Sequence, residues 1–281
     1  MLRRRLKEEH RTPEQIREHY EVEKELANRL REAPPQERRL LYASLYDELF
    51  RRLPHHPSLT QKSSPERTRA ALAHQMAFLR RFLDNDITFM EIGPGDCALS
   101  FAVCERVRQV YAVDVSAELT RRSASPPNFK LTLFDGCIIP LPAESVHVAY
   151  SNQLIEHLHP DDAIEQLKST CAALVPGGNY ICITPNRLSG PWDISMYFDP
   201  LPAGFHLKEY TFTELRDVLR AVGFSRVRAY VGGRGVYARC PVFLMGLFEK
   251  IVDALPYRFG KPIARSLPVR LFLGIRLVAI K

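Results

Sequence analysis

The sequence predicts an α/β fold: a mostly parallel sheet with helices on both faces, preceded by a helical N-terminal extension. From residue 88 onward, short apolar runs alternate with helical stretches, which is typical of a parallel sheet with crossover helices. Residues 1–87 instead show apolar residues at helical spacing within charged segments. We therefore expect a helical extension or lid over residues 1–87 and a main domain over residues 88–281.

Three helices are expected in the N-terminal extension. Thr12 followed by Pro13 is a helix start signal, and the helix should run to about Glu32, where two prolines end it. A second helix follows, with leucines recurring from residue 40 to 50, then a linker at residues 54–57 and a third helix over about residues 64–82. No pattern in this extension points to chemistry.

The main domain begins with strands and helices that alternate along the chain. Strands are expected at residues 88–92, 109–113, 129–133, 146–151, 179–184 and 225–231. Helices are expected at residues 98–106, 117–123, 161–174 and 211–222, and a turn at residues 175–178. Residues 274–281 are expected to form a last edge strand.

The turn after the first strand is the strongest local signal. The strand ends in Glu91-Ile92-Gly93-Pro94-Gly95-Asp96, and a helix begins at once. Glycines here let the backbone approach a ligand closely, at the strand ends where parallel sheets bind ligands. Asp114 closes the next strand, where a carboxylate can hold both hydroxyls of a ribose.

The charges around this turn separate two cofactors. Gly93 and Gly95, with Ala98, also satisfy the dinucleotide fingerprint of an NAD(P)-dependent oxidoreductase, which remains an alternative. A pyrophosphate on this turn would be repelled by Glu91 and Asp96. S-adenosylmethionine carries an ammonium and a sulfonium and no phosphate, so carboxylates attract it. The acidic turn favours S-adenosylmethionine.

Two later segments complete a resemblance. Phe134-Asp135-Gly136 follows the third strand, and Ser151-Asn152-Gln153-Leu154-Ile155-Glu156-His157 follows the fourth. With the glycine turn, these segments make the chain similar to the class I (Rossmann-like) S-adenosylmethionine-dependent methyltransferases over about residues 87–231 and 271–281.

The resemblance implies a seven-stranded sheet whose last strand is antiparallel. It also implies that Gly93 and Gly95 approach the methionine moiety, that Glu91 holds its amino group, that Asp114 binds the ribose and that Asp135 binds the adenine. The other expected cofactor-lining residues are Val115, Gly136, Asn152 and Gln153.

The acceptor is expected to meet the methyl group beyond the fourth and fifth strands. A general base is needed only if the acceptor must lose a proton, as a hydroxyl must. His206 and His157 are the candidate bases, and no metal site is expected. Residues 186–210 form a long loop rich in Gly, Pro and aromatic residues, as acceptor-binding loops often are. We expect methyl transfer to a small-molecule or glycan-like acceptor, at oxygen. A DNA acceptor is disfavoured because its usual motif is missing after the fourth strand.

The C-terminal region differs from the rest in charge. Residues 88–219 hold nine basic and sixteen acidic side chains, whereas residues 220–281 hold twelve basic and two acidic ones. The basic, apolar segment 240–270 is expected either to contact an anionic membrane surface or to pack on the N-terminal helices or on a second subunit of a homodimer. The first interpretation would make a lipid-linked acceptor plausible. The expected location is cytoplasmic, at the inner membrane surface if that contact forms. A cofactor-binding but catalytically silent partner subunit is a further alternative.

Overall fold

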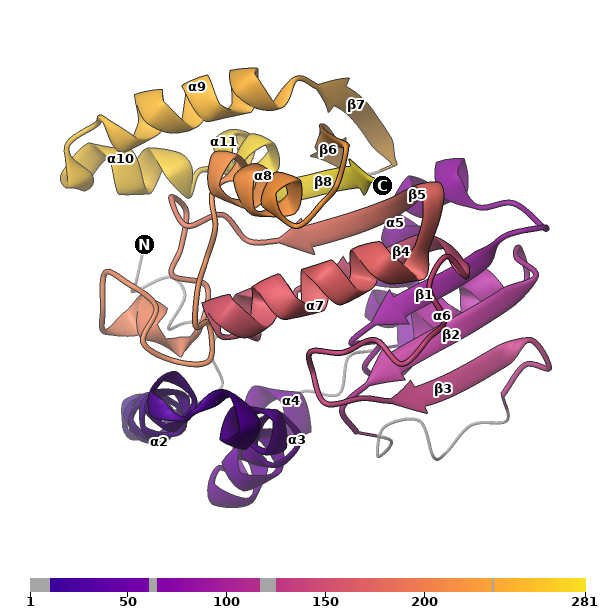
Figure 1. Cartoon of the computed structure of the whole chain (residues 1–281). Coiled ribbons are helices and arrows are strands. Elements are labelled where there is room, and N and C mark those ends of the chain that lie inside the picture. Colours follow the sequence, from indigo (N-terminus) through magenta and orange to yellow (C-terminus); the bar gives the residue numbers. More distant parts are fainter. Residues whose placement is uncertain (1–10, 61–64, 117–124, 234) are drawn as a thin grey trace.

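A single sheet of eight strands organises the molecule (Figure 1). The computed structural model describes residues 11–60, 65–116, 125–233 and 235–281. The strand order is β3-β2-β1-β4-β5-β8-β6-β7. The strands are β1 (Thr88–Ile92), β2 (Gln109–Asp114), β3 (Phe129–Leu133), β4 (Val146–Asn152), β5 (Leu174–Thr184), β6 (Arg226–Gly233), β7 (Val236–Cys240) and β8 (Ile275–Ile280). Strands β1 to β5 pair in parallel, as the sequence predicts.

The strand sequences explain their places in the sheet. β1 lies between β2 and β4, and all five of its residues are buried, whereas the edge strand β3 has no fully buried residue. Helices cover both faces (Figure 1): α5 (Pro65–Leu79) and α6 (Ala98–Cys104) lie on one, α7 (Pro160–Ala173) and α8 (Phe212–Ala221) on the other. The predicted α/β fold with an N-terminal helical part is confirmed.

Three details differ from the expectation. The sheet has eight strands because β7 adds an antiparallel strand beyond β6. β8 is antiparallel as expected, but it lies between β5 and β6 and is not an edge strand. The expected turn at residues 175–178 lies within β5 as an irregularity, where the register to β4 shifts. The helix expected at residues 117–123 falls outside the described residues.

A buried ion pair joins the N-terminal helices to α7. They are α2 (Pro13–Glu32), which Thr12 caps, α3 (Pro35–Arg52) and the short α4 (Pro57–Thr60), which begins inside the expected linker. The Arg38 guanidinium donates two hydrogen bonds of 2.6 Å to the Asp162 carboxylate, and both side chains are buried. Burial alone would raise the pKa of Asp162, but Arg38 holds this pKa below its ordinary value.

The C-terminal segment forms three helices before the last strand. They are α9 (Val242–Asp253), α10 (Tyr257–Ala264) and α11 (Leu267–Leu273). These helices contact α8 and β6, and Figure 1 shows α9 and α10 at the top with α2–α4 at the bottom. The expectation that this segment packs on the N-terminal helices is therefore wrong. Among the described residues, no helix combines the length and the apolar character needed to cross a bilayer.

Candidate functional site

The expected cofactor residues meet at one edge of the sheet. In register, Ile92 at the end of β1 lies opposite Val113 of β2 and Ser151 of β4. The glycine turn after β1, Asp114 on β2 and Asn152 on β4 therefore share this edge, and Asp135 follows β3 there. The β3 and β5 arrowheads in Figure 1 point to the side on which α2 and residues 186–210 lie.

The two glycines of the turn have different surroundings. Both have positive φ, +68° at Gly93 and +56° at Gly95, a conformation that strains other residues. The Gly93 N–H donates to the Val113 carbonyl at 2.9 Å, and a Cβ on Gly93 would meet Leu154 at 3.0 Å. A Cβ on Gly95 would meet no atom of the described residues within 4 Å. As far as the described part of the chain goes, the backbone at Gly95 thus faces open space, which a ligand can fill.

Glu91 is a buried carboxyl that accepts hydrogen bonds from Ser100. The Ser100 hydroxyl donates to its Oε2 at 2.6 Å. Burial, with smaller contributions from the nearby Asp96 and Asp114, raises the pKa of Glu91 to about 8, although hydrogen bonds from Ser100 oppose the rise. A carboxyl in this state is stabilised as its anion by a cation placed beside it.

Asp114 lies against the glycine turn. Its Oδ1 accepts a hydrogen bond from the Ser116 N–H at 3.2 Å. Burial raises the pKa of Asp114, while hydrogen bonds from the backbone of Ser116, Val115 and Gly95 oppose that rise. Asp114, the residue expected to bind the ribose, is therefore in direct contact with the glycine turn. The half-buried Val115 lies next to them.

Asp135 is engaged by its own turn and by an N-terminal helix. Its Oδ1 accepts from the backbone N–H of Cys137 at 2.9 Å and of Ile138 at 2.8 Å. Its Oδ2 lies 3.0 Å from the Arg39 guanidinium of α3. Gly136 has φ +88°, and a Cβ there would approach the Tyr42 ring of α3 to 3.0 Å. The helix α3 therefore lies next to Asp135 and Gly136, where the adenine is expected to bind.

Asn152 and Gln153 end the fourth strand at the same edge. Asn152 is the last residue of β4 and is half-buried. Gln153 is exposed, has φ +55°, and its N–H donates to the Ile183 carbonyl at 2.8 Å. Both lie between the glycine turn and the short helix η2 (Ile155–His157).

A cavity of about 310 Å³ adjoins η2 and contains both candidate bases. Its walls come from α2, α3, the residues between α3 and α4, η2 and the loop of residues 186–210, whose two ends meet where the Arg187 N–H donates to the Tyr210 carbonyl at 2.9 Å. The lining residues are Arg11, His19, Glu23, Tyr46, Leu49, His56, His157, Trp192, Asp193, Ile194, Met196, Tyr197, Phe205 and His206.

His206 is oriented by a buried carboxylate. Its Nδ1 lies 2.7 Å from Oε1 of Glu209, so this nitrogen carries a proton, and in the neutral ring Nε2 is left as an acceptor. Burial opposes the charged ring, but the Glu209 hydrogen bond and the negative charges of Glu156, Glu209 and Asp193 raise the pKa of His206. The Oε1 atom of Glu156 is buried and has no hydrogen-bond partner among the described residues, and burial raises the pKa of Glu156 to about 7.

His157 lies beside His206 and stays neutral. The two ring centroids are 4.8 Å apart, and His157 Nδ1 donates to the Phe205 carbonyl at 3.1 Å. Burial, together with His206, lowers the pKa of His157 to about 3. Of the two candidate bases, His206 is the one whose surroundings favour taking up a proton.

The N-terminal helix α2 supplies ionisable groups that the sequence analysis missed. Arg11 donates to His19 Nδ1 at 2.6 Å, and His19 Nε2 therefore donates to Glu23 at 2.7 Å. Glu23 also accepts from the Phe205 N–H at 2.9 Å. A signal was present: His19 and Glu23 interrupt an apolar stripe that continues through Ile16, Leu26 and Leu30, all of them buried.

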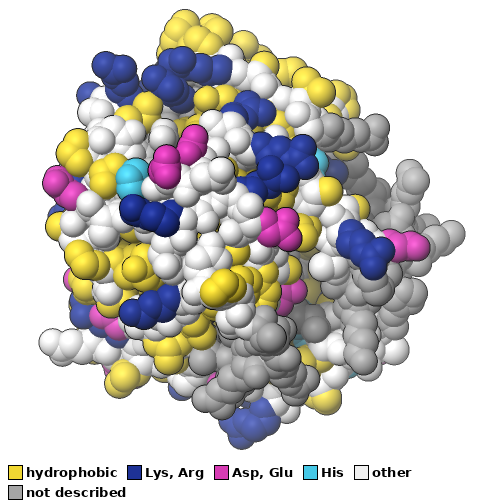
Figure 2. All heavy atoms as spheres, turned by 90° about the vertical axis from the view of Figure 1, so that its right-hand side faces the viewer, with side chains coloured by type: hydrophobic (Ala, Val, Ile, Leu, Met, Phe, Trp, Pro, Cys, Tyr) yellow, Lys and Arg dark blue, Asp and Glu magenta, His cyan; other side chains and the backbone are white. Residues whose placement is uncertain are grey.

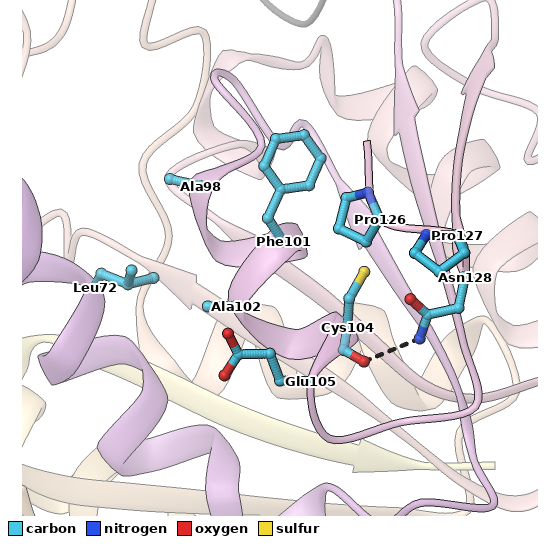
Figure 3. A pocket seen from close by; sticks show the side chains of 9 residues that line it. All are labelled: Leu72, Ala98, Phe101, Ala102, Cys104, Glu105, Pro126, Pro127 and Asn128. Atoms are coloured by element: carbon cyan, nitrogen blue, oxygen red, sulfur yellow. Dashed lines mark hydrogen bonds between the residues drawn. The ribbon is translucent and has the colours of Figure 1, made fainter. Parts of the chain in front are cut away.

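A separate hollow of about 640 Å³ lies beside α6, away from these residues (Figure 3). Its walls are formed by α6, Leu72 and residues 126–128, and the Asn128 amide donates to the Cys104 carbonyl at 2.9 Å. The charged residue of its lining is Glu105, and the expected cofactor residues do not line it. We therefore place the candidate site at the strand ends and not in this hollow.

The family of the chain follows from its sequence. A family model described as a methyltransferase domain matches residues 65–229, more than half of the chain and the segment that carries the glycine turn, Asp114, Asp135 and η2. The chain belongs to this methyltransferase family. Its cofactor is S-adenosylmethionine, and the NAD(P)-dependent oxidoreductase finds no support in the comparisons. No curated protein matches the sequence.

Solved methyltransferase structures share the fold at low sequence identity. A chain of the Haloferax volcanii complex between the Trm112 methyltransferase activator and a methyltransferase is 17% identical, with a TM-score of 0.53 over 73% of this chain and 87% of that chain. An S-adenosylmethionine-dependent methyltransferase from Archaeoglobus fulgidus is 16% identical, with a TM-score of 0.51 over 76% and 94%. Haemonchus contortus phosphoethanolamine N-methyltransferase 1, solved with phosphoethanolamine and S-adenosylhomocysteine, is 14% identical, with a TM-score of 0.56 over 88% and 50%.

Within the described part of the methyltransferase, three groups of side chains have donor atoms close enough to hold a metal ion. They are His19–Glu23–His56, Glu156–His157–His206 and Cys137–Asp162–Glu165, each with donor atoms within 4.8 Å of one another. An arginine already supplies positive charge to two of them, Arg11 at His19 and Arg38 at Asp162. The remaining group, Glu156–His157–His206, contains both candidate bases, and a proton bound there can supply the positive charge in place of a metal ion.

Proposed function

We propose that this methyltransferase transfers a methyl group to a hydroxyl oxygen of a small, sugar-like acceptor held in the 310 Å³ cavity. The observation that carries the proposal is the His206–Glu209 pair on the wall of that cavity. Transfer to an oxygen requires that a proton leave the acceptor, and an imidazole with a fixed tautomer can take it.

The composition of the cavity supports a sugar-like acceptor. Tyr46, Trp192 and Phe205 give it aromatic walls, while Glu23 and Asp193 add hydrogen-bond acceptors. A polyhydroxylated ring needs both kinds of group, because its carbon face is apolar and its hydroxyls donate and accept. The volume is at the lower end of the range for ligand pockets, which suits a small acceptor or the end of a larger one.

For the cofactor, the roles expected from the sequence fit the geometry. The buried Glu91 carboxyl, with its pKa raised to about 8, suits the methionine ammonium, and the open space at Gly95 suits the close approach of a ligand. We assign the ribose to Asp114 and the adenine end to Asp135 and Gly136, with Val115, Asn152 and Gln153 as lining. S-adenosylmethionine supplies a methyl group on a positively charged sulfur.

The proton path follows from the hydrogen bonds. As the acceptor oxygen forms its bond to the methyl carbon, its proton passes to His206 Nε2. Glu209 at 2.7 Å and the nearby Glu156 then stabilise the imidazolium. We further propose that α2 and α3 act as a fixed wall of the acceptor cavity and not as a mobile lid, because the Arg38–Asp162 pair is buried.

The test uses radiolabelled S-adenosylmethionine and a panel of monosaccharides, nucleotide sugars, phenols and amines. His206→Ala should lower methyl transfer to the preferred hydroxyl acceptor by about 10²–10⁴-fold. Its affinity for S-adenosylhomocysteine should not change. His159→Ala is the matched control, since His159 caps α7 and does not line the cavity. Transfer to amines alone, or full activity in His206→Ala, would show the proposal to be wrong.

A lipid-linked sugar is the membrane-bound form of this acceptor class. Its head group would use the same cavity, and its lipid would remain in the bilayer. Such an acceptor requires the methyltransferase to work at a membrane surface.

A further inference from the structure

The helices α9, α10 and α11 expose an unusual amount of apolar surface. Among the described residues, ten of the nineteen exposed large hydrophobic side chains lie between residues 243 and 272. They are Phe243, Leu244, Leu247, Ile251, Tyr257, Phe259, Ile263, Leu267, Leu271 and Phe272. Figure 2 shows hydrophobic side chains along the top of the molecule, where α9 lies in Figure 1, with Lys and Arg side chains beside them.

This apolar surface follows from the helical pattern. The opposite side of the same helices already packs inward through Val242, Met245, Val252, Ala264 and Leu273. The outward set recurs at a spacing of four residues, as in Phe243–Leu247–Ile251. A helix that is apolar on both sides is normally buried on both, but no other described segment of the chain covers the outer side of these helices. We call the ten side chains the outer apolar face.

The charges around the outer apolar face are mainly positive. Lys250, Arg258 and Arg270 are exposed, against the single exposed acid Asp253 in the same three helices. The helices are 12, 8 and 7 residues long, too short to span a bilayer. Short helices with an apolar side and basic flanks suit an orientation parallel to an anionic lipid surface.

The same helices contact the loop of residues 186–210, which we call the acceptor loop. Glu249 of α9 accepts from the Asn186 side chain at 2.6 Å, and Lys261 of α10 donates to the Leu188 carbonyl at 3.1 Å. Arg265 donates to the Gly190 carbonyl at 2.9 Å. The Arg270 guanidinium lies 5.7 Å from the centre of the Trp192 ring, which lines the acceptor cavity. The outer apolar face is thus attached to one wall of that cavity.

We propose that the outer apolar face docks on an anionic phospholipid bilayer and presents the acceptor cavity to an amphiphilic, lipid-linked acceptor within it. The docking itself depends only on the face. The choice of acceptor rests on the proposed function.

Sedimentation with lipid vesicles tests the docking on the full chain. Vesicles of phosphatidylcholine containing phosphatidylglycerol should bind the methyltransferase at low salt, and binding should fall at high salt. Vesicles of phosphatidylcholine alone should bind much less. Lys250→Glu with Arg258→Glu should weaken binding by at least ~fivefold for each charge. The triple variant Phe243→Ser, Leu247→Ser, Ile251→Ser should abolish it.

Matched controls separate the face from general surface effects. Leu40 and Leu59 are exposed to 74% and 46% and lie outside both α9–α11 and the loop of residues 186–210, so Leu40→Ser with Leu59→Ser should bind vesicles normally. Arg51→Glu with Lys130→Glu is the control for charge. Every variant should bind S-adenosylhomocysteine and methylate a water-soluble acceptor as the parent does. If the protein binds anionic vesicles but transfers no methyl group to a hydroxyl acceptor, the proposed function is wrong and the docking proposal stands.

Three results would overturn the docking proposal. One is the absence of sedimentation with anionic vesicles at low salt. Another is an equal loss of binding in the control variants. The third is a concentration-dependent dimer, seen by light scattering, that the triple variant dissociates while vesicles bind neither protein; the face would then be an interface between two copies of the chain.

Discussion

At the scale of single residues, burial of Glu91 favours its neutral form until a cationic ligand binds beside it. The residue is 6% exposed, and its carboxyl accepts a hydrogen bond from Ser100 and has its pKa raised to about 8 by burial. At neutral pH it is mostly protonated. A bound ammonium would stabilise the anion, so cofactor binding and loss of this proton are coupled.

The coupling predicts how affinity depends on pH. In the free protein the pKa of Glu91 is about 8, and in the complex the ammonium lowers it. The complex therefore holds fewer protons than the free protein below pH 8. Affinity for S-adenosylhomocysteine should rise with pH from about pH 6, by at most about tenfold per pH unit, and level off near 8. Calorimetry in buffers of different ionisation enthalpy counts the released proton.

Two variants test this assignment. Glu91→Gln keeps the size of the side chain but cannot ionise, and it should bind with no such pH dependence. Asp96→Asn, on an exposed neighbour, should keep most of the dependence. An unaltered pH profile in Glu91→Gln would place the titrating group elsewhere.

Asp114 gives an independent prediction at the ribose. Asp114→Ala should weaken cofactor binding by about 1–3 kcal/mol, because ribose hydroxyls lose their acceptor when they are desolvated. Calorimetric titration measures the affinity, and a thermal melt of the free variant checks the fold. If the affinity is unchanged, the ribose partner is another residue.

At the scale of elements, the attachment of α3 to α7 decides whether the N-terminal helices can form a site. The Arg38–Asp162 pair is exposed to only 4% and 2%. Asp162→Ala would leave the guanidinium buried without its partner, and we expect a loss of about 3–5 kcal/mol in the free energy of unfolding. Urea denaturation, followed by circular dichroism, measures it.

The element prediction has a matched control and a rescue. The exposed pair of Arg52 and Glu25 also joins two N-terminal helices, and Glu25→Ala should cost less than about 1 kcal/mol. The double variant Arg38→Met with Asp162→Leu should recover most of the stability, because it removes both charges. Equal losses at the buried and the exposed pair would contradict this account.

At the scale of the whole molecule, the ends of the parallel strands bring distant segments to one place. The proposed cofactor residues lie between residues 91 and 153, whereas α2 and α3 line one side of the proposed acceptor cavity and residues 186–210 line the other. The loop of residues 186–210 in turn contacts α9 and α10. This loop therefore links the proposed acceptor cavity to the helices that carry the outer apolar face.

Much of the fold was readable from the sequence because its signals are local. Apolar runs and helix starts predicted β1 and β3 at their observed bounds, and Thr12 caps α2 as expected. The glycine turn and Asp114 were also readable, since a parallel sheet places successive strand ends at one edge. The eighth strand was missed because β7 is short and mostly exposed, so it lacks an apolar run.

The acceptor side was decided only by tertiary structure. His206 was nominated from its loop, but its pairing with Glu209 and its approach to His157 depend on how that loop folds. His19 and Glu23 lie more than 130 residues before His157 in the chain and reach the same cavity through tertiary packing, which joins α2 and α3 to the main core and α3 to α7 through Arg38 and Asp162. The spacing of residues along the chain indicates which residues share a helix or strand. It does not indicate which helices and strands pack together. That packing buries an ionisable group and sets its pKa.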